Sequence, residues 1–488
     1  MYICIRFITL QESMRKYIGL VLAISAVCVS LNLFAKNDFE KLSWIKEVGA
    51  KTFPSSSKIY YANDFGAMGD AMQTNTDAIQ KAIDVCAANG GGKVSFHPGI
   101  YVSGSIFVKS NVNLEIPKGT TIIGSQNISD YKRIDTRVAG IEMNWPSALI
   151  NIMGQKNAAI SGDGVINGRG KVFWDKYWSM RKSYEPKGLR WIVDYDCDRP
   201  QGIIVSDCEN VSIKNIVLYQ PGFWSLHILY SKQVTVDGII ISNNIEGRGP
   251  STDGIDIDSS SKILIQNSNI NCNDDNFCLK SGRDADGLRV NRPCEYVVIR
   301  NCIAGHGDGL FTCGSETSGG IRNIVAYNLK GIGTKYGLRF KSTVQRGGVI
   351  ENIYLSNIEM IEVKDPFIVD LNWNPAYSTS LLPKEYNPDS IPVHWKKMLI
   401  PVDPKVGTPK FKNIWFQDIN IKNASTCIKV NGIESSTIDN FHFNNVHFQG
   451  EKAGNINWAN NWECINFSVK SNDGLPLELK NNKNINIR

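Results

Sequence analysis

The chain has 488 residues, enough for one large domain or two or three small ones, and its 42% hydrophobic content is that of a soluble globular protein. Its formal net charge is +6, from 53 Lys and Arg against 47 Asp and Glu. The basic residues are spread among acidic ones and form no concentrated patch with interleaved aromatics, which excludes a typical nucleic-acid-binding protein. The mild positive charge suits an acidic substrate without indicating one by itself.

Cysteine usage argues against a disulfide scaffold and against a metal centre. The sequence has 12 cysteines, and two of them, Cys4 and Cys28, precede the expected mature chain. The others are sparse, and no CxxC spacing of the metal-binding type occurs. Cys272 and Cys278 flank an acidic pair, but their spacing does not distinguish free thiols from a bridge. We expect no metal and no other cofactor.

A basic and then apolar segment near the start predicts a secretory signal peptide over residues 1–35. The basic residues 14–16 precede an apolar run, Ile18–Val29, that is too short for a stable membrane span. Cleavage is expected after Ala35, which makes the protein secreted or periplasmic. An uncleaved N-terminal anchor is the alternative. Residues 36–488 are expected to form a single domain.

Residues 74–89 form the one clear amphipathic helix pattern of the chain, and three glycines follow it. Its apolar face carries Ala78, Ile79, Ala82, Ile83 and Cys86.

Two long segments interrupt the pattern of short strands and are expected to form outward loops. The first, Arg169–Arg199, contains Phe173, Trp174, Tyr177, Trp178 and Trp191. The second, Val363–Lys410, contains Trp373, Tyr377 and Trp395. Aromatic rings stack on sugar faces, but for any single ring the more common role is to pack a loop onto the core.

A seven-residue motif of alternating apolar residues recurs through the second half of the chain. Its copies begin at Asn210, Gln233, Lys262, Tyr296, Asn323, Asn352, Asn413 and Asn440. Alternation with a period of two predicts short strands. Residues that tolerate a left-handed turn punctuate the copies: Asn215, Gly238, Asn267, Asn301, Asn328, Asn357, Asp418 and Asn445.

The copies are mostly 23 to 34 residues apart, and each interval holds several short strands. This favours an all-β fold, a right-handed parallel β-helix, over a sandwich, whose hairpins would need paired turn residues. Ladders of Asn side chains are expected inside the coil. The amphipathic helix of residues 74–89 is expected to cap the exposed end of the first coil.

Acidic groups fall in consecutive copies of the repeat. Aligning the strands that follow Asp253 and Asp275 places these two carboxylates on neighbouring coils, about 4.8 Å apart, with Asp274 beside them. Strict alternation would turn Asp253 and Asp275 inward, so a turn or bulge must precede each strand. Asp256, on the same stretch as Asp253, is a rival candidate.

Carboxylates this close raise one another's pKa, so one of them is expected to hold a proton. A carboxylic acid opposite a water activated by a carboxylate is the inverting arrangement of glycoside hydrolysis, with separations of about 6.5–9.5 Å. We assign Asp274 as the acid, and Asp253 with Asp275 as the groups that hold the water. His306, one coil further on, would tune the acid or bind a sugar hydroxyl.

Two cations complete the predicted site. Arg339 and Lys341 are two residues apart on one strand and share its outer face, an arrangement that suits a substrate carboxylate. Each of these signals alone is more often a solvated turn, a structural histidine or an exposed strand face. Their order and their placement on successive coils make the combined prediction stronger.

These residues resemble the polygalacturonases and related pectin hydrolases of glycoside hydrolase family 28. The family's Asn-Thr-Asp, Asp-Asp, Gly-His-Gly and Arg-Ile-Lys motifs are similar to Ser251–Asp253, Asp274–Asp275, Gly305–Gly307 and Arg339–Lys341. The similarity extends to Asp64–Ala67 near the start and to the segment Pro221–His227, which contains Trp224. Ser251 replaces the usual Asn, and Phe340 replaces Ile.

The resemblance implies a metal-free enzyme that inverts at the anomeric carbon. It implies that Asp274 is the acid, that Asp253 and Asp275 are the base pair, and that Arg339 and Lys341 bind a galacturonate carboxylate. Asp256 and Trp224 are expected to contact the substrate. Residues 314–320 and 346–348 are similar to exo-acting bacterial members, which release galacturonate from chain ends.

We therefore expect a secreted, monomeric exo-polygalacturonase acting on the acidic polysaccharide pectin. The first alternative is an α-galacturonidase that acts on rhamnogalacturonan. Alternatives from other classes are a pectate lyase, which would need calcium-binding acids and an Arg or Lys base, and a non-catalytic carbohydrate-binding solenoid, which would not need the three acids.

Overall fold

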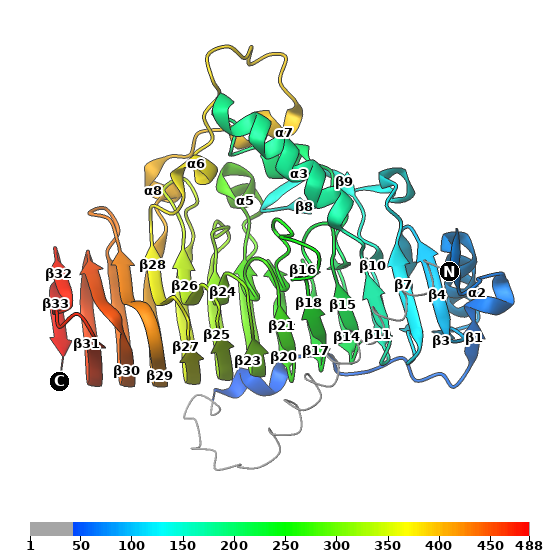
Figure 1. Ribbon diagram of the computed structural model, residues 1–488, viewed down its shortest axis with the longest axis horizontal. Helices are drawn as coiled ribbons and strands as arrows, with labels where there is room; N and C mark the ends of the chain where they lie inside the picture. Colours follow the sequence, from blue (N-terminus) through cyan, green and yellow to red (C-terminus); the bar gives the residue numbers. More distant parts are fainter. Residues whose placement is uncertain (1–41, 488) are drawn as a thin grey trace, which may run out of the picture. The chain divides into compact units, whose positions relative to one another are not determined.

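The computed structural model describes residues 42–487, and the chain divides into two compact units, Met1–Ser43 and Trp44–Arg488. The expected signal peptide lies outside the described residues. The unit that starts at Trp44 is a parallel β-helix in which short strands follow one another around successive coils (Figure 1). None of the helices in residues 42–487 has the length and hydrophobicity that a membrane crossing requires.

Thirty-one strands belong to one network of parallel pairs, arranged in three ladders along the coils. The first ladder contains β5 (Ile106–Val108), β10 (Ile150–Met153), β13 (Ile203–Ser206), β16 (Leu226–Leu229), β19 (Ile255–Asp258), β22 (Phe277–Lys280), β24 (Gly309–Cys313), β26 (Tyr336–Lys341), β28 (Asp365–Asp370), the later parts of β29 (Lys410–Asn431) and β30 (Ile438–Asn457), and β32 (Glu478–Lys480).

The second and third ladders complete the coils. The second contains β1 (Ile59–Tyr61), β3 (Gly92–Ser95), β6 (Val112–Glu115), β11 (Lys156–Ser161), β14 (Glu209–Lys214), β17 (Lys232–Asp237), β20 (Ser261–Gln266), β23 (Cys294–Ala304), β25 (Ile321–Ile332), β27 (Val349–Ile361), β29, β30, β31 (Ala459–Ser471) and β33 (Lys483–Ile487). The third contains β2 (Asp70–Thr74), β4 (Gly99–Ser103), β7 (Thr120–Gly124), β12 (Val165–Asn167), β15 (Val217–Tyr219), β18 (Ile240–Ser242) and β21 (Asn269–Asn271), and continues into β23.

The turns between strands use left-handed backbone, as the repeats predicted. All eight punctuating residues, from Asn215 to Asn445, have φ between 49° and 69°. The residues that begin the eight copies are also left-handed, with φ between 54° and 61°, and these include Tyr296, which sequence reasoning did not predict. Two left-handed residues per copy bend the chain at both ends of a short strand.

The predicted Asn ladders exist, but on the outside of the coil. The Asn328 amide donates to Asn301 Oδ1 at 2.9 Å, and the Asn357 amide donates to Asn328 Oδ1 at 2.7 Å. Asn301 and Asn357 are exposed. The left-handed turns project these Asn side chains outward, so the ladders do not lie inside the coil as expected. Apolar residues fill the interior instead.

The interior is a stack of aliphatic and aromatic side chains in parallel register. Ile255 pairs with Phe277, and Ile257 pairs with Leu279, all fully buried as predicted. Phe277 in turn pairs with Phe311 on the next coil. Because like side chains repeat at each coil, the core is continuous from Val94 to Cys464.

A helix caps the N-terminal end of the solenoid, as predicted. Helix α2 (Thr76–Ala88) lies at that end in Figure 1. Its buried residues are Ile79, Ala82, Ile83 and Cys86, and they belong to the main core. The 3-10 helices η3 (Ser43–Glu47), η4 (Ala62–Phe65) and η5 (Ile128–Asp130) also lie in the first part of the described chain.

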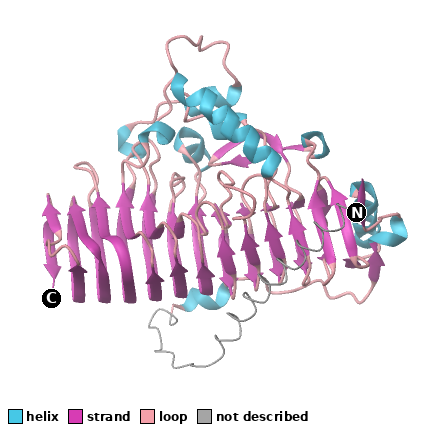
Figure 2. Cartoon of the chain, in the orientation of Figure 1, coloured by secondary structure: helices cyan, strands magenta, loops and turns pink. Residues whose placement is uncertain are grey.

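The two predicted insertions are helical segments, not irregular loops, and Figure 2 shows their helices gathered on one side of the strands. The first contains α3 (Lys171–Tyr184), η6 (Glu185–Lys187) and α4 (Val193–Asp196). The second is shorter than predicted because β28 occupies its start; it contains α6 (Pro375–Ser378), α7 (Val393–Met398) and α8 (Pro404–Gly407). Helix α5 (Asp284–Val290) follows β22, and an antiparallel hairpin of β8 (Arg133–Val138) and β9 (Ile141–Pro146) lies beside these helices.

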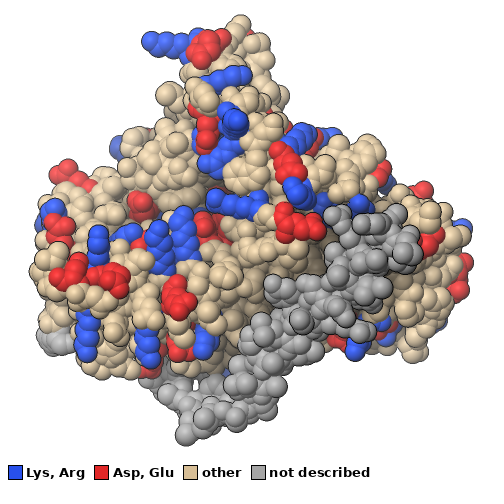
Figure 3. All heavy atoms as spheres, viewed as in Figure 1, with Lys and Arg blue, Asp and Glu red and all other residues tan. Residues whose placement is uncertain are grey.

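The surface and the cysteines agree with the compositional analysis. On the face shown in Figure 3, Lys and Arg lie among Asp and Glu, without a large patch of one sign. The ten cysteines of the described residues, from Cys86 to Cys464, are free and buried. Cys272 and Cys278 are therefore not bridged.

Candidate active site

Three carboxyl groups meet in the turns that precede β19 and β22. Ile255 pairs with Phe277, so Asp253 lies beside Asp275 on the neighbouring coil. The Gly254 N–H donates to the Asp275 carbonyl at 2.8 Å and fixes this register. One carboxylate oxygen from each of Asp253, Asp274 and Asp275 lies within 4.8 Å of the others. The structure thus brings the three predicted acids together.

The separation of these acids is shorter than we expected. Inverting glycosidases typically hold their two carboxyl groups about 6.5–9.5 Å apart, whereas the oxygens here lie within 4.8 Å. The reason is that Asp274 and Asp275 are consecutive residues, and Asp253 lies on the adjacent coil, at a spacing of about 4.8 Å. The acids remain close enough for one water molecule to form hydrogen bonds with two of them.

Asp275 is held as a carboxylate by four donors. Its Oδ1 accepts hydrogen bonds from the Gly309 N–H, the Thr312 hydroxyl and Arg339 Nη1, each at 2.9 Å. Its Oδ2 accepts from Lys341 Nζ at 2.8 Å. Burial alone would raise the pKa of Asp275, but the cations of Lys341 and Arg339 outweigh it and hold the pKa well below the ordinary value.

Asp274 has the opposite environment. Burial, and then the neighbouring carboxylates of Asp308 and Asp275, raise the pKa of Asp274 to about 6. Burial, with Asp274 and Asp256 next, also raises the pKa of Asp253. The cluster therefore combines one firmly ionised carboxylate with carboxyl groups that keep a proton above their ordinary range, which is the combination that acid–base chemistry needs.

Arg339 and Lys341 share the outer face of β26, as predicted, and both contact Asp275. Aromatic rings surround them. The Arg339 guanidinium lies 4.1 Å from the centre of the Tyr336 ring, and Lys341 Nζ lies 4.4 Å from the Trp373 ring. Each cation is about 5% exposed and forms an ion pair with Asp275.

Sequence reasoning missed two charged residues of this cluster, Lys280 and Glu316. Lys280 Nζ lies 3.1 Å from Glu316 Oε2, 3.6 Å from Asp256 Oδ1 and 3.7 Å from Asp253 Oδ2. Lys280 ends β22, on the outer face of the same strand that follows Asp275. Its position two residues after Cys278 on an alternating strand could have indicated that it faces the acids.

Asp256 and Trp224 lie beside Lys280. The Asp256 carboxylate is fully buried, and neither oxygen has a hydrogen-bond partner. Trp224 is stacked on Phe223, with ring centres 5.1 Å apart, and its ring lies 4.9 Å from Lys280 Nζ. Their predicted contacts with substrate stay predictions, and in the structure both residues surround the lysine.

His306 is not part of the acid cluster. It lies on the turn before β24, is exposed, and donates from its backbone N–H to Asn271 Oδ1 at 3.2 Å. Within residues 42–487, no hydrogen bond or ion pair joins its ring to the three acids. Its predicted role with the acid or a sugar hydroxyl stays a prediction.

The β8–β9 hairpin, which sequence reasoning did not predict, forms a wall beside the cluster. Its Arg137 forms a fully buried ion pair with Asp258 at the end of β19, at 2.8 Å. The carbonyl of Gly140, at the hairpin turn, accepts a hydrogen bond from the Arg283 N–H. A side chain at Gly140 would lie 2.8 Å from Glu316 Cγ, so only glycine allows the turn to approach the cluster this closely.

The two helical insertions pack against each other above this wall. Trp191 of the first insertion and Trp395 of the second lie with ring centres 5.5 Å apart. Asp196 accepts hydrogen bonds from His394 Nε2 at 2.6 Å and from Trp395 Nε1 at 2.8 Å. Phe173, Trp174, Tyr177 and Trp191 are buried, so these rings pack the insertions, which was the more common role expected of them.

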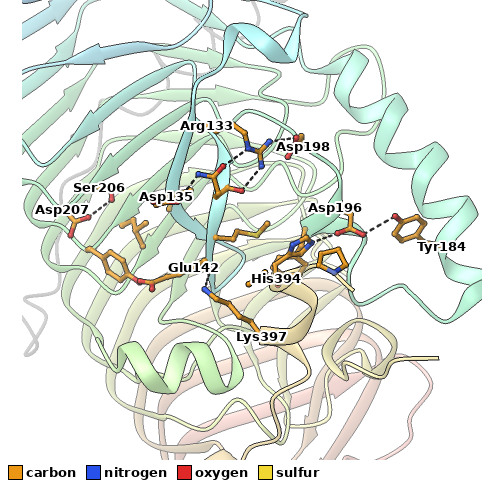
Figure 4. Close-up of a pocket in the computed structure, with 18 residues that line it drawn as sticks. Arg133, Asp135, Glu142, Tyr184, Asp196, Asp198, Ser206, Asp207, His394 and Lys397 are labelled. Carbon is orange, nitrogen blue, oxygen red and sulfur yellow. Dashed lines mark hydrogen bonds and ion pairs between the residues drawn. The ribbon is translucent and has the colours of Figure 1, made fainter. Parts of the chain in front are cut away.

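A separate cleft of about 970 Å³ lies between the hairpin, α4, α7 and the ends of β13 and β16. Figure 4 shows His394 directed at Asp196, with Tyr184 on the other side of that carboxylate. None of the predicted site residues lines this cleft. The acid cluster is therefore a distinct site.

The acid cluster has enough carboxylate oxygens to ligate a cation, but the side chains of Arg339 and Lys341 already neutralise one of its carboxylates. The oxygens of Asp253, Asp274 and Asp275 lie close enough to share an ion. However, both oxygens of Asp275 already accept from Arg339 and Lys341. A metal ion would have to displace these cations, so the residues present fit acid–base chemistry better.

A cluster of acids with pKa values shifted in opposite directions is suited to glycoside hydrolysis. The profile of glycosyl hydrolases family 28 matches residues 108–385, more than half of the chain. The chain belongs to this family, and the protein is therefore a glycoside hydrolase.

Several relatives support this assignment. The chain is 26% identical to a probable polygalacturonase of Vitis vinifera over 408 residues, covering 81% of this chain and 75% of that protein. It is 25% identical to the exo-poly-alpha-D-galacturonosidase of Dickeya chrysanthemi over 452 residues, covering 82% and 72%. The family 28 exopolygalacturonase of Yersinia enterocolitica matches in structure with a TM-score of 0.75 at 22% identity, covering 89% and 79%. The structural match confirms the predicted fold.

Proposed function

We propose that the protein is an exo-acting polygalacturonase, which hydrolyses α-linked galacturonate from the ends of pectin chains. The observation that carries the exo mode is the close approach of the β8–β9 hairpin to the acid cluster, with the packed insertions beside it. Gly140 of the hairpin abuts Glu316, and the two insertions pack together through Trp191 and Trp395. A groove open at both ends suits internal cleavage, whereas a site closed on one side admits only a chain end.

In this mechanism Asp274 is the general acid. It donates its proton to the glycosidic oxygen as the bond from that oxygen to the anomeric carbon breaks. A water molecule held by Asp253 and Asp275 attacks the same carbon from the opposite face and gives its proton to a carboxylate. Asp275 is a poor nucleophile, because four donors occupy its oxygens, so an activated water and inversion are proposed.

Arg339 and Lys341 are proposed to bind the galacturonate carboxylate next to the scissile bond. Both lie beside the acid cluster on the outer face of β26, and two adjacent cations suit a carboxylate better than a neutral sugar. The name of the Dickeya chrysanthemi relative, an exo-poly-alpha-D-galacturonosidase, supports the same substrate.

The protein is further proposed to be exported and to act as a monomer. The basic residues 14–16 and the apolar run Ile18–Val29 support a cleaved leader that ends at Ala35. Cell fractionation and N-terminal sequencing of the exported protein test this; an intact leader on membrane-bound protein would indicate an anchor instead.

The deciding experiment is incubation of the purified protein with polygalacturonate and, separately, with rhamnogalacturonan backbone oligosaccharides, with a chelator present. Free galacturonate from polygalacturonate, as the sole early product, supports the proposal; mixed oligomers would indicate internal cleavage. Release only from rhamnogalacturonan would move the assignment to an α-galacturonidase. An unsaturated product that absorbs in the ultraviolet would indicate a lyase, and no product from either substrate would favour a binding solenoid.

Stereochemistry gives a second, independent result from the same incubation. Proton NMR of the first product formed distinguishes the β anomer, expected for inversion of an α linkage, from the α anomer. Initial α anomer would show retention and would mean that one of the acids acts as a nucleophile, as the short separation within the cluster would then explain.

A further inference from the structure

We infer that Lys280 is a positioning residue of the hydrolysis: its ammonium group favours the carboxylate form of Asp253, which activates the attacking water. This inference rests on the proposed function. Lys280 Nζ lies 3.7 Å from Asp253 Oδ2 and 3.6 Å from Asp256 Oδ1. At such distances an opposite charge lowers the pKa of a carboxyl group by about one to three pH units.

The other cations of the site are committed elsewhere. Arg339 and Lys341 approach opposite oxygens of Asp275, at 2.9 and 2.8 Å. Among residues 42–487, Lys280 is the only Lys or Arg within 4.0 Å of an Asp253 oxygen. The charge of Asp253 therefore depends on this single lysine.

The surroundings of Lys280 fix its position. Glu316 Oε2 accepts from its ammonium group at 3.1 Å, and the Trp224 ring lies 4.9 Å from the same nitrogen. The side chain is only 4% exposed, so water does not screen its charge strongly. Titratable groups face Lys280 and Asp253 from several elements: His227 from β16, Asp256 from β19, Cys272, Asp274 and Asp275 from the turn before β22, Cys278 from β22 and Glu316 after β24.

The chemistry explains why this charge is needed. Burial and the acids Asp274 and Asp256 raise the pKa of Asp253, and Lys280 opposes them. A protonated Asp253 cannot accept the proton that the water loses as its oxygen bonds to the anomeric carbon. The Glu316 carboxylate pairs with the same ammonium group, so it weakens the effect of Lys280 on the pKa of Asp253.

The test uses two substitutions with opposite predictions. Lys280→Met removes the charge at nearly constant size, and the acid limb of the kcat profile on polygalacturonate should move to higher pH by about one to three pH units. Glu316→Gln removes the competing carboxylate, so the limb should move to lower pH. Lys280→Arg should restore most of the wild-type profile. The matched control is Lys330→Met, which breaks an exposed ion pair with Glu359 on the continuation of the third ladder and should change nothing.

The outcomes separate this inference from other roles. A large increase in KM for Lys280→Met with an unmoved acid limb would make Lys280 a substrate ligand and would overturn the inference. An unmoved limb in Glu316→Gln would also overturn it, and this variant keeps the question answerable if Lys280→Met fails to fold. Opposite shifts in the two variants would support it.

A measurement without substrate distinguishes failure of this inference from failure of the proposed function. A carboxyl group whose pKa is raised by folding binds protons more tightly in the folded state, so it reduces stability as pH rises. The Tm of Lys280→Met should therefore fall more steeply with rising pH than that of the wild type. If the wild type releases no sugar, the proposed function fails, while equal slopes of Tm against pH would overturn the coupling of Lys280 to Asp253.

Discussion

Replacement of Asp274 by Asn tests the assignment of the general acid. The site raises the pKa of Asp274 from 3.8 to about 6. At pH 5 a group with that pKa is about 90% protonated, against about 6% for an ordinary aspartic acid. General acid catalysis typically contributes a factor of about 10² to 10⁴, and loss of the acid also removes a fixed donor from an enclosed site. We expect a loss of at least about a thousandfold in kcat/KM on polygalacturonate.

The assay is the release of galacturonate between pH 4 and pH 8. Wild-type activity should fall about tenfold per pH unit above the pKa of Asp274, and this alkaline limb should vanish from the residual activity of Asp274→Asn. The leaving group of an activated substrate, such as a nitrophenyl galacturonide, needs little protonation. The activity of Asp274→Asn on such a substrate should therefore fall far less than its activity on polygalacturonate. If the variant, with an unchanged Tm, keeps more than a tenth of wild-type activity on polygalacturonate, the acid assignment is wrong.

Three further predictions concern charge and backbone. Arg339→Ala should raise KM for acidic substrate by at least about tenfold, since a charged hydrogen bond is lost; an unchanged KM would contradict carboxylate binding. Arg137→Ala should cost about 3–5 kcal/mol in chemical denaturation, because the fully buried Asp258 then loses its Arg partner and keeps only His227 and the Ser259 hydroxyl, and a cost below about 1 kcal/mol would refute this. Despite burial, Arg137 and His227 lower the pKa of Asp258 to about 2, so the wild type should lose this stability as pH falls from about 4 towards 2. Asn328→Ala, at φ 54° and with two ladder bonds, should be destabilised more than Asn328→Gly, which keeps the backbone conformation; equal Tm values would contradict that reasoning.

The repeats made the fold and the acid cluster predictable because both depend on local periodicity. The offset that places Asp253 and Asp275 just before their strands was visible in the alternation of Ile255, Ile257, Phe277 and Leu279. Parallel coils stack with little freedom of register, so residues at equivalent positions of consecutive repeats meet in space. This is why three acids and two cations could be placed together from sequence.

The rest of the site was not predictable because it depends on contacts between segments far apart in the chain. The β8–β9 hairpin belongs to no repeat, and its approach to Glu316 through Gly140 depends on tertiary packing. Lys280 was not predicted as a site residue, since its partners Glu316 and Trp224 come from other coils. The aromatic rings of the insertions were also ambiguous, because packing and sugar stacking use the same residue types.

The succession of coils also separates the chemistry from the length of the molecule. The acids and cations lie between the turn before β19 and the end of β26, and Trp224, Trp373 and the β8–β9 hairpin contact them from outside these coils. Strands β31 and β33 contribute none of these residues. Coils near the C-terminal end, such as β31 and β33, are therefore free to be shortened, extended or replaced in evolution or by engineering without altering a reacting group. The solenoid is therefore modular: a few coils carry the catalytic residues, and the flanking coils determine the stability of the fold and the length of the molecule.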